Sequence, residues 1–208
     1  MENNNDILGS VSDYYSGKLA LHGSTPQGVD WNGELSQTQR FVELCKIISQ
    51  PEHFSVADIG CGYGALFDYI ESYYRDFSYV GVDISESMIK AADARLQPHQ
   101  NQRLVVGHKS DTVTDYSIAS GIFNVRLDKP DAVWLDYIIQ TLDAVNLSSK
   151  SGFSFNCLTS YSDQDRKRDY LYYADPCQLF DICKKRYSRQ VALLHDYGLY
   201  EFTVLVRK

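Results

Sequence analysis

The sequence has few cysteines and no long apolar run. Its five cysteines, at positions 45, 61, 157, 177 and 183, form no Cys-x-x-Cys pair, and no histidine stands at zinc-ligand spacing. The odd number does not suit a disulfide framework, and the spacing predicts no metal site. No apolar run approaches the ~18 residues of a membrane span, and the N-terminus lacks the pattern of a signal peptide. We therefore expect a cytoplasmic protein with reduced thiols and no membrane partner.

Positive charge is also scarce. The chain has 20 Lys and Arg against 27 Asp and Glu, a net charge of -7, and its best basic run, 166–168, is flanked by aspartates. A surface that follows nucleic-acid phosphates needs clustered basic residues, so nucleic acid is not an expected partner. Tyrosine, in contrast, is abundant at 16 of 208 residues. Tyrosine combines an apolar ring with a polar tip, which suits a wet, polar pocket.

Three glycines at alternate positions, Gly60, Gly62 and Gly64, follow the apolar run 56–59 and precede the amphipathic stretch 65–70. This order predicts a strand, a tight turn and a helix. Glycine permits backbone conformations and close ligand approach that a Cβ would block, and the turn presents a helix N-terminus to a ligand. A dinucleotide fingerprint has its third glycine five residues after the first, whereas here it follows after four. The segment therefore predicts a nucleotide-type cofactor site without the dinucleotide spacing.

The next predicted strand strengthens this interpretation. The run 79–84 places Asp83 at its end, 23 residues beyond Gly60. A carboxylate at this position can accept hydrogen bonds from the two ribose hydroxyls of a nucleoside. The two segments together predict nucleoside binding.

Two motifs of the sequence, Asp58-Ile59-Gly60-Cys61-Gly62-Tyr63-Gly64 and Val80-Gly81-Val82-Asp83-Ile84-Ser85, resemble those of the class I (Rossmann-like) S-adenosylmethionine-dependent methyltransferases. The resemblance covers nearly the whole chain and is sharpest over 56–123. It implies S-adenosyl-L-methionine as the cofactor, S-adenosyl-L-homocysteine as the product, and a small-molecule methyltransferase of the bacterial kind.

The alternation of strands and helices predicts an α/β fold with a doubly wound, mostly parallel sheet. We expect one domain over 1–208, divided into an N-terminal helical lid, 1–50, and a Rossmann-like core, 51–208. The resemblance implies seven strands with a C-terminal antiparallel hairpin. The polar segment 159–175 is too long for a simple connection, which predicts an insertion that sets substrate specificity.

Residue patterns predict where the elements lie. In the lid we expect frayed residues 1–9, a helix over 11–21, a turn-rich segment 24–33, and a helix over 35–50 that starts from a Ser36-x-x-Gln39 capping box. In the core we expect helices over 65–75, 85–96, 131–147 and 176–186, with Ser85, Asp131 and Asp175 as N-caps. Strands are expected over 56–59, 78–82, 103–107, 115–124 with its trailing small residues, 153–158, 190–196 and 200–207.

The resemblance implies a set of cofactor contacts around the glycine turn and the strand ends. Ile84 and Met88 would lie beside the adenine, and Ser120 and Gly121 border the cofactor at the switch point of the sheet. Arg40 is the candidate partner of the methionine carboxylate, although an exposed helix arginine fits it as well. The full set is Asp58, Gly60, Cys61, Gly62, Asp83, Ile84, Met88, His108, Lys109, Ser120, Gly121 and Arg40.

Methyl transfer from a sulfonium is an in-line displacement that needs alignment and no protein nucleophile. A hydroxyl acceptor needs a general base, for which histidine is best tuned, so His22 and His195 are the candidates. The alternative is that each is an ordinary surface or half-buried histidine. Asn124 is expected to contact the acceptor, with a turn-capping role as the alternative. Further substrate contacts are expected from the aromatic residues Tyr14, Tyr15, Trp31 and Tyr161.

The class of acceptor follows partly from what is missing. Enzymes that methylate planar nitrogens of nucleobases or glutamine generally carry an Asn/Asp-Pro-Pro-aromatic run after the fourth strand, where this chain has Asn124-Val125-Arg126. The paired glutamates of arginine methyltransferases are also missing, because no glutamate occurs over 110–126. A small organic molecule, methylated at oxygen or nitrogen, remains as the substrate. Two alternatives stay open: a non-catalytic cofactor-binding or scaffold protein on the same fold, and an NAD-dependent oxidoreductase. The sequence specifies no oligomeric state.

Overall fold

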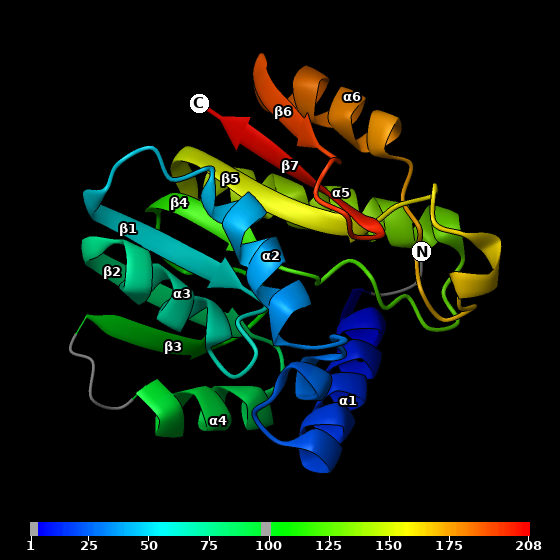
Figure 1. Cartoon of the computed structure of the whole chain (residues 1–208), viewed down its shortest axis with the longest axis horizontal. Helices are drawn as coiled ribbons and strands as arrows, with labels where there is room; N and C mark the ends of the chain where they lie inside the picture. Colours follow the sequence, from blue (N-terminus) through cyan, green and yellow to red (C-terminus); the bar gives the residue numbers. More distant parts are fainter. Residues whose placement is uncertain (1–3, 97–100) are drawn as a thin grey trace.

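The chain forms a seven-stranded sheet in a computed structural model that describes residues 4–96 and 101–208 (Figure 1). The strand order is β3-β2-β1-β4-β5-β7-β6. Neighbours from β3 to β5 pair in parallel, and β7 runs antiparallel to both of its neighbours. The predicted α/β fold with a C-terminal antiparallel hairpin is confirmed. The strands are β1 Glu52–Ile59, β2 Arg75–Asp83, β3 Gln102–Val106, β4 Thr114–Ala119, β5 Ser149–Leu158, β6 Gln190–Leu194 and β7 Glu201–Arg207.

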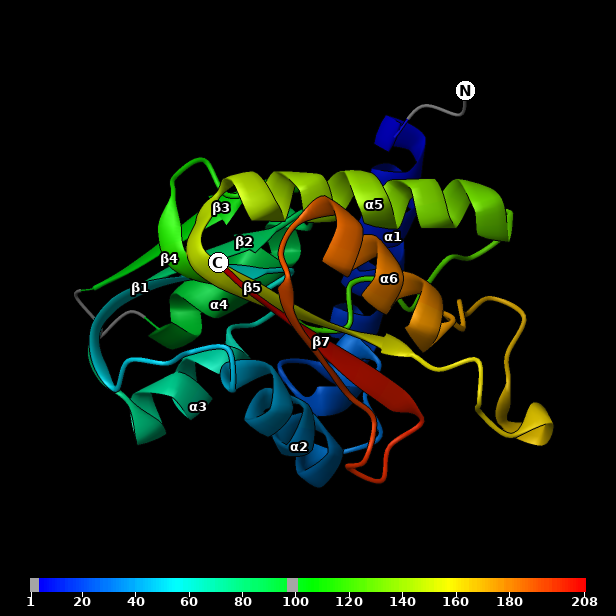
Figure 2. The same ribbon diagram turned by 90° about the horizontal axis from the view of Figure 1, so that it is seen from above.

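Helices cover both faces of the sheet (Figure 2). One hydrophobic core joins the sheet to α1, α5 and α6, and a second joins its other face to α2, α3 and the end of α4. Successive strand residues serve the two cores in turn, as Val204 and Leu205 of β7 do, because side chains alternate across a strand. The helices are α1 Asn4–His22, α2 Glu34–Cys45, α3 Ala65–Tyr73, α4 Glu86–Leu96, α5 Asp131–Leu147 and α6 Pro176–Arg186, with the 3-10 turns η1 Pro26–Val29 and η2 Gln164–Arg166.

The N-terminal segment differs from the prediction. Helix α1 begins at Asn4, within the stretch expected to be frayed, because Ile7 and Val11 are buried in the core beneath it. Helix α2 begins at Glu34 and ends at Cys45, and the capping box is wrong: Ser36 lies inside the helix and donates its hydroxyl to the carbonyl of Gly33. Helix α1 and η1 lie by the carboxyl ends of the strands (Figure 1), whereas α2 packs against β5 and β7.

Element boundaries in the core differ from the predictions at several places. Strand β1 begins at Glu52 rather than at 56, and β2 begins at Arg75 rather than at 78, because these two residues pair with each other. Helix α3 accordingly ends at Tyr73, and β6 ends at Leu194. Strand β5 begins at Ser149, directly after α5, and Pro130 rather than Asp131 occupies the N-cap position of α5. The other two predicted caps are confirmed. Ser85 accepts from the backbone N–H of Met88, and Asp175 accepts from the N–H groups of Cys177 and Gln178.

The predicted insertion, 159–175, returns to the body of the protein through two isolated bridges. Val125 pairs with Leu171, and Thr159 pairs with Ala174. Among the described residues, no helix is both long enough and apolar enough to cross a membrane.

Candidate functional site

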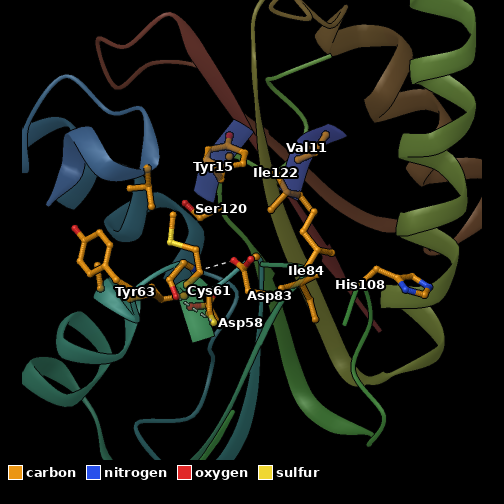
Figure 3. Close-up of a pocket in the computed structure, with 18 of the residues that line it drawn as sticks. Val11, Tyr15, Asp58, Cys61, Tyr63, Asp83, Ile84, His108, Ser120 and Ile122 are labelled. Carbon is orange, nitrogen blue, oxygen red and sulfur yellow. Dashed lines mark hydrogen bonds between the residues drawn. The ribbon is translucent and has the colours of Figure 1, made fainter. Parts of the chain in front are cut away.

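A cavity of ≈ 890 Å³, including space open to solvent, lies at the carboxyl ends of β1, β2 and β4 (Figure 3). Its wall contains Ile59 and Asp83, the last residues of β1 and β2, and Ser120, which follows β4. Strand β1 lies between β2 and β4. The chain adds β2 and β3 on one side of β1 and then β4 and β5 on the other, so the order of the strands reverses at β1. Ligands of such sheets bind at this switch point.

The glycine turn forms the floor of the cavity. Gly60, Gly62 and Gly64 have φ angles of 77°, 54° and 84°, a left-handed conformation that favours glycine. A Cβ on Gly60 would lie 2.1 Å from the side chain of Ile122. The N–H groups of Gly60 and Cys61 both donate to the carbonyl of Val82, at 2.7 and 3.0 Å, which ties the turn to β2. The sequence therefore needs glycine here for backbone shape and for close packing.

Asp83 is held from both sides by backbone groups. Its two carboxylate oxygens accept from the N–H of Gly62 at 2.9 Å and of Ser85 at 2.8 Å. Burial raises the pKa of this carboxyl, while the bonds from Ser85 and Gly62 oppose that rise. An ionised carboxylate has about four lone-pair sites. About two remain, which is the number that a vicinal diol with two O–H donors needs.

Asp58 is a second buried carboxyl in the cavity wall. It is 1% exposed, and its Oδ2 accepts from the hydroxyl of Tyr79 at 2.7 Å. Burial raises its pKa to about 7, against the opposing hydrogen bond from Tyr79, and the nearby Asp83 adds to the rise. A pKa of about 7 means that Asp58 changes its protonation state near neutral pH. Asp83 differs from it in accepting two backbone hydrogen bonds, which favour the charged form.

The turn after β4 carries an unsatisfied polar atom. The hydroxyl oxygen of Ser120 is buried and has no hydrogen-bond partner among the described residues, and the side chain lines the cavity (Figure 3). Leaving a buried polar group unpaired costs ~1–3 kcal/mol, so a polar group of a ligand would stabilise this site. The next residue, Gly121, has a φ of 74°, and a Cβ there would lie 2.2 Å from the ring of Trp31. Trp31 therefore packs directly against the turn.

The structure brings most of the predicted cofactor residues together. Tyr15 and Trp31, which were expected to contact substrate, share the same cavity with them. The predicted residues that line it are Asp58, Gly60, Cys61, Gly62, Asp83, Ile84, Met88, His108, Ser120, Gly121, Tyr15 and Trp31.

Half of the cavity wall was not identified from the sequence. Gln37 and Phe41 of α2 and Tyr137 and Thr141 of α5 are pairs spaced by four residues, and this spacing puts each pair on one helix face. The spacing was a usable signal, but it does not tell which cavity a face meets. The additional lining residues are Val11, Val29, Gln37, Phe41, Ile59, Tyr63, Ala65, Leu66, Gly107, Ile122, Tyr137 and Thr141.

The expected catalytic residues lie elsewhere. His22 and His195 are exposed, and neither lines the cavity. Asn124 is 5% exposed, and its Oδ1 accepts from the N–H of Leu158 at 3.0 Å, so it ties the loop after β4 to β5. Its placement supports a structural role rather than contact with the acceptor, although the bond goes to β5 and does not cap the turn.

Several expected contacts with substrate or cofactor also lie outside the cavity wall. Tyr161 is 70% exposed and packs its ring near His195. Tyr14 donates its hydroxyl to Asp30 at 2.7 Å, and Lys109 is exposed. No residue of 159–175 lines this cavity. The placement therefore does not support the insertion as its specificity wall.

Arg40 is neither exposed nor part of the cavity wall. It is 5% exposed, and its Nε and Nη2 donate to the carboxylate of Glu201 at 2.8 and 2.7 Å. Its Nη1 donates to the carbonyl of Ser36 at 2.7 Å, and the guanidinium stacks over the ring of Trp31, 3.8 Å from its centroid. These partners occupy the guanidinium, so the placement argues against the expected bond to a methionine carboxylate.

Within the described residues, no group of His, Cys, Asp and Glu side chains is arranged to hold a metal ion.

Known proteins share both the sequence and the fold. Residues 57–145 match the family described as "Methyltransferase domain". A Mycobacterium tuberculosis protein named "Putative methyltransferase Rv1506c" is 55% identical over 163 residues, which is 78% of this chain and 98% of that protein.

Solved structures extend the likeness to almost the full length. The N-methyltransferase NodS from Bradyrhizobium japonicum WM9, in complex with S-adenosyl-L-homocysteine, has a TM-score of 0.68 at 10% identity, with 95% of this chain and 98% of that chain covered. The DhpI–SAH complex has a TM-score of 0.67 at 13% identity, with 97% and 96% covered. At these identities the structures show the fold, and the M. tuberculosis relative shows the family. The chain belongs to the class I S-adenosylmethionine-dependent methyltransferases.

Proposed function

We propose that this protein transfers the methyl group of S-adenosylmethionine to an oxygen or nitrogen of a small organic acceptor. The observation that carries the proposal is the arrangement of Asp83 in the cavity. Its two backbone bonds, from Gly62 and Ser85, fix the carboxylate and leave about two acceptor sites, which matches the two ribose hydroxyls of the cofactor.

Residues around the cavity fit the other parts of the cofactor. Ile84, Met88 and His108 would border the adenine. The hydroxyl of Ser120, which has no partner among the described residues, would bond a polar group of the methionine part. Bound S-adenosylmethionine supplies an electrophilic methyl group on a positively charged sulfur. Aromatic rings attract cations, and Tyr15 and Trp31 both line the cavity.

The protein's part in the transfer is alignment and exclusion of water. Holding two reactants in attack geometry, about 3 to 3.5 Å apart, lowers the barrier without a protein nucleophile. His22 and His195 lie outside the cavity, so neither is placed to act as a general base there. An acceptor that is nucleophilic without losing a proton needs no such base and therefore fits this site best. A neutral amine has this property, whereas a hydroxyl needs a base.

Calorimetric titration of the purified chain tests the cofactor. S-adenosylhomocysteine should bind with one site per chain, and NAD should not bind. Binding of NAD without binding of S-adenosylhomocysteine would overturn the proposal in favour of an oxidoreductase.

Transfer itself is tested with methyl-labelled S-adenosylmethionine and extracts separated into small-molecule, protein and nucleic-acid fractions. The proposal predicts enzyme-dependent label in the small-molecule fraction. Label in a macromolecular fraction alone contradicts the small acceptor. Tight binding without transfer to any fraction supports the non-catalytic alternative.

A further inference from the structure

Three polar side chains from distant parts of the chain meet next to Trp31 and Gly121, two residues of the cavity wall. Arg40 of α2, Glu201 of β7 and Asn156 of β5 are 5%, 1% and 0% exposed. Arg40 donates twice to the carboxylate of Glu201, and Asn156 donates through Nδ2 to Oε2 of the same carboxylate at 2.5 Å. None of the three lines the cavity. The cluster is therefore placed to act on a ligand only through other residues.

Glu201 fixes the orientation of the Asn156 amide. A carboxylate only accepts hydrogen bonds, so Asn156 must present its NH₂ group to Glu201 and its oxygen to the other side. That oxygen accepts from the backbone N–H of Gly121 at 2.7 Å. A reversed amide would place two donors against each other at Gly121. The charge on Glu201 therefore determines whether the turn after β4 is held.

The other end of the cluster reaches the same turn through Trp31. The Arg40 guanidinium lies over the Trp31 ring, and that ring packs on Gly121, where a Cβ would lie 2.2 Å away. Ser120, whose buried hydroxyl has no partner among the described residues, directly precedes Gly121 in the turn. Both ends of the cluster thus meet at a part of the wall that is prepared for a polar ligand group.

We infer that Glu201 is a positioning residue for the cofactor, which sets the Ser120–Gly121 turn through Asn156 and the Trp31 ring through Arg40. A buried ion pair is weak evidence for stability alone, because desolvation offsets its attraction. The Arg40–Glu201 pair is also connected to the cavity wall, through Asn156 to Gly121 and through Arg40 to Trp31, and these connections support a role in ligand binding. The inference rests on the proposed function, since the ligand held by the turn is S-adenosylmethionine or its product.

The Glu201→Gln variant tests the inference by replacing an acceptor with a donor. The new NH₂ group would face the NH₂ of Asn156 or the guanidinium of Arg40, so the amide reverses or the pair separates. We expect the dissociation constant for S-adenosylhomocysteine to rise about tenfold to a hundredfold, as the loss of a buried hydrogen bond to a charged group predicts.

A double variant, Asn156→Asp with Glu201→Gln, moves the charge while the net charge stays constant. The new carboxylate can accept from both Gly121 and the new glutamine amide, whose oxygen still accepts from Arg40. This variant should recover most of the lost affinity, whereas loss of packing alone would be deepened by a second substitution. Recovery of affinity is therefore a result that a merely structural role does not predict.

Glu43→Gln is the matched control. Glu43 is another buried carboxylate, 4% exposed, and lies on α2, where it pairs with Lys46 at 2.5 Å and accepts from Gln39 at 3.3 Å. Within the part of the chain that the structure describes, no hydrogen bond joins it to the Ser120–Gly121 turn. We expect it to change the melting temperature without changing the affinity. If Glu201→Gln does not fold, Asn156→Ala takes its place, because it keeps the Arg40–Glu201 pair and removes the acceptor for Gly121 together with one donor to Glu201.

The outcomes separate the two proposals. If the native chain binds no S-adenosylhomocysteine, the proposed function fails. If the native chain binds it and the folded Glu201→Gln or Asn156→Ala variant binds equally well, the positioning role is overturned. It is also overturned if the affinity loss in Glu43→Gln equals that in Glu201→Gln, or if the double variant binds no better than Glu201→Gln.

Discussion

The Asp83→Asn variant is expected to bind S-adenosylhomocysteine at least tenfold more weakly than the native chain. The native carboxylate uses one lone pair of each oxygen for the N–H groups of Gly62 and Ser85 and has about two left. An asparagine has one acceptor oxygen. It can satisfy one of the two backbone donors, and its NH₂ group must face the other.

The magnitude follows from the bonds lost. A hydrogen bond to a charged group contributes ~1.5–3 kcal/mol, and each 1.4 kcal/mol is a factor of ten, so one lost ribose bond raises the dissociation constant by about 10- to 150-fold. The unpaired backbone N–H costs ~1–3 kcal/mol of stability. Removal of the buried charge, whose pKa is raised by burial, offsets part of that cost. Binding should therefore suffer more than folding.

Calorimetry with S-adenosylhomocysteine and urea unfolding measure the two effects separately. Asp115→Asn is the control: Asp115 accepts from the N–H and the hydroxyl of Ser55, at 2.8 and 2.6 Å, near the start of β4 and away from the cavity. It should keep native affinity. A folded Asp83→Asn variant with native affinity, or an equal loss of affinity in both variants, would refute the assignment of Asp83 to the ribose.

Two further outcomes are expected. Gly121→Ala should displace Trp31, shift its fluorescence and weaken cofactor binding. The control is Gly198→Ala, at the same φ of 74° but with nothing within 4 Å of the added Cβ, which should only lose stability through backbone strain. Equal fluorescence spectra of the two variants would contradict the contact between Trp31 and Gly121. Asp58→Asn should remove one pH dependence of the free energy of unfolding. Since the pKa of about 7 in the folded chain exceeds the ordinary 3.8, the contribution of Asp58 to native stability is fully present below pH ~4 and is lost as the pH rises to ~7. The variant should therefore gain on the order of 3–4 kcal/mol over the native chain across this window in urea titrations, and a constant difference would contradict it.

The sequence by itself determined the strand–turn–helix at 56–70, the position of Asp83 and the layered α/β fold. These depend on local chemistry: glycine at positive φ, alternation along strands and caps such as Asp175, whose partners lie within three residues. Parallel strands with short connections then bring their carboxyl ends to one edge. The cofactor half of the candidate site follows from that rule.

Only the tertiary structure decided what the isolated side chains do. Arg40 was predicted to bind the methionine carboxylate, with an exposed helix arginine as the alternative, yet its partner, Glu201, lies 161 residues away on β7. Asn124 accepts from Leu158 at the end of the neighbouring strand β5, and Tyr137 and Thr141 reach the cavity from α5. Helical spacing tells which residues share a face, but not which surface that face meets. Contacts between segments far apart in the chain depend on how the layers pack, and these contacts placed Trp31 on Gly121 and left both predicted histidine bases outside the cavity.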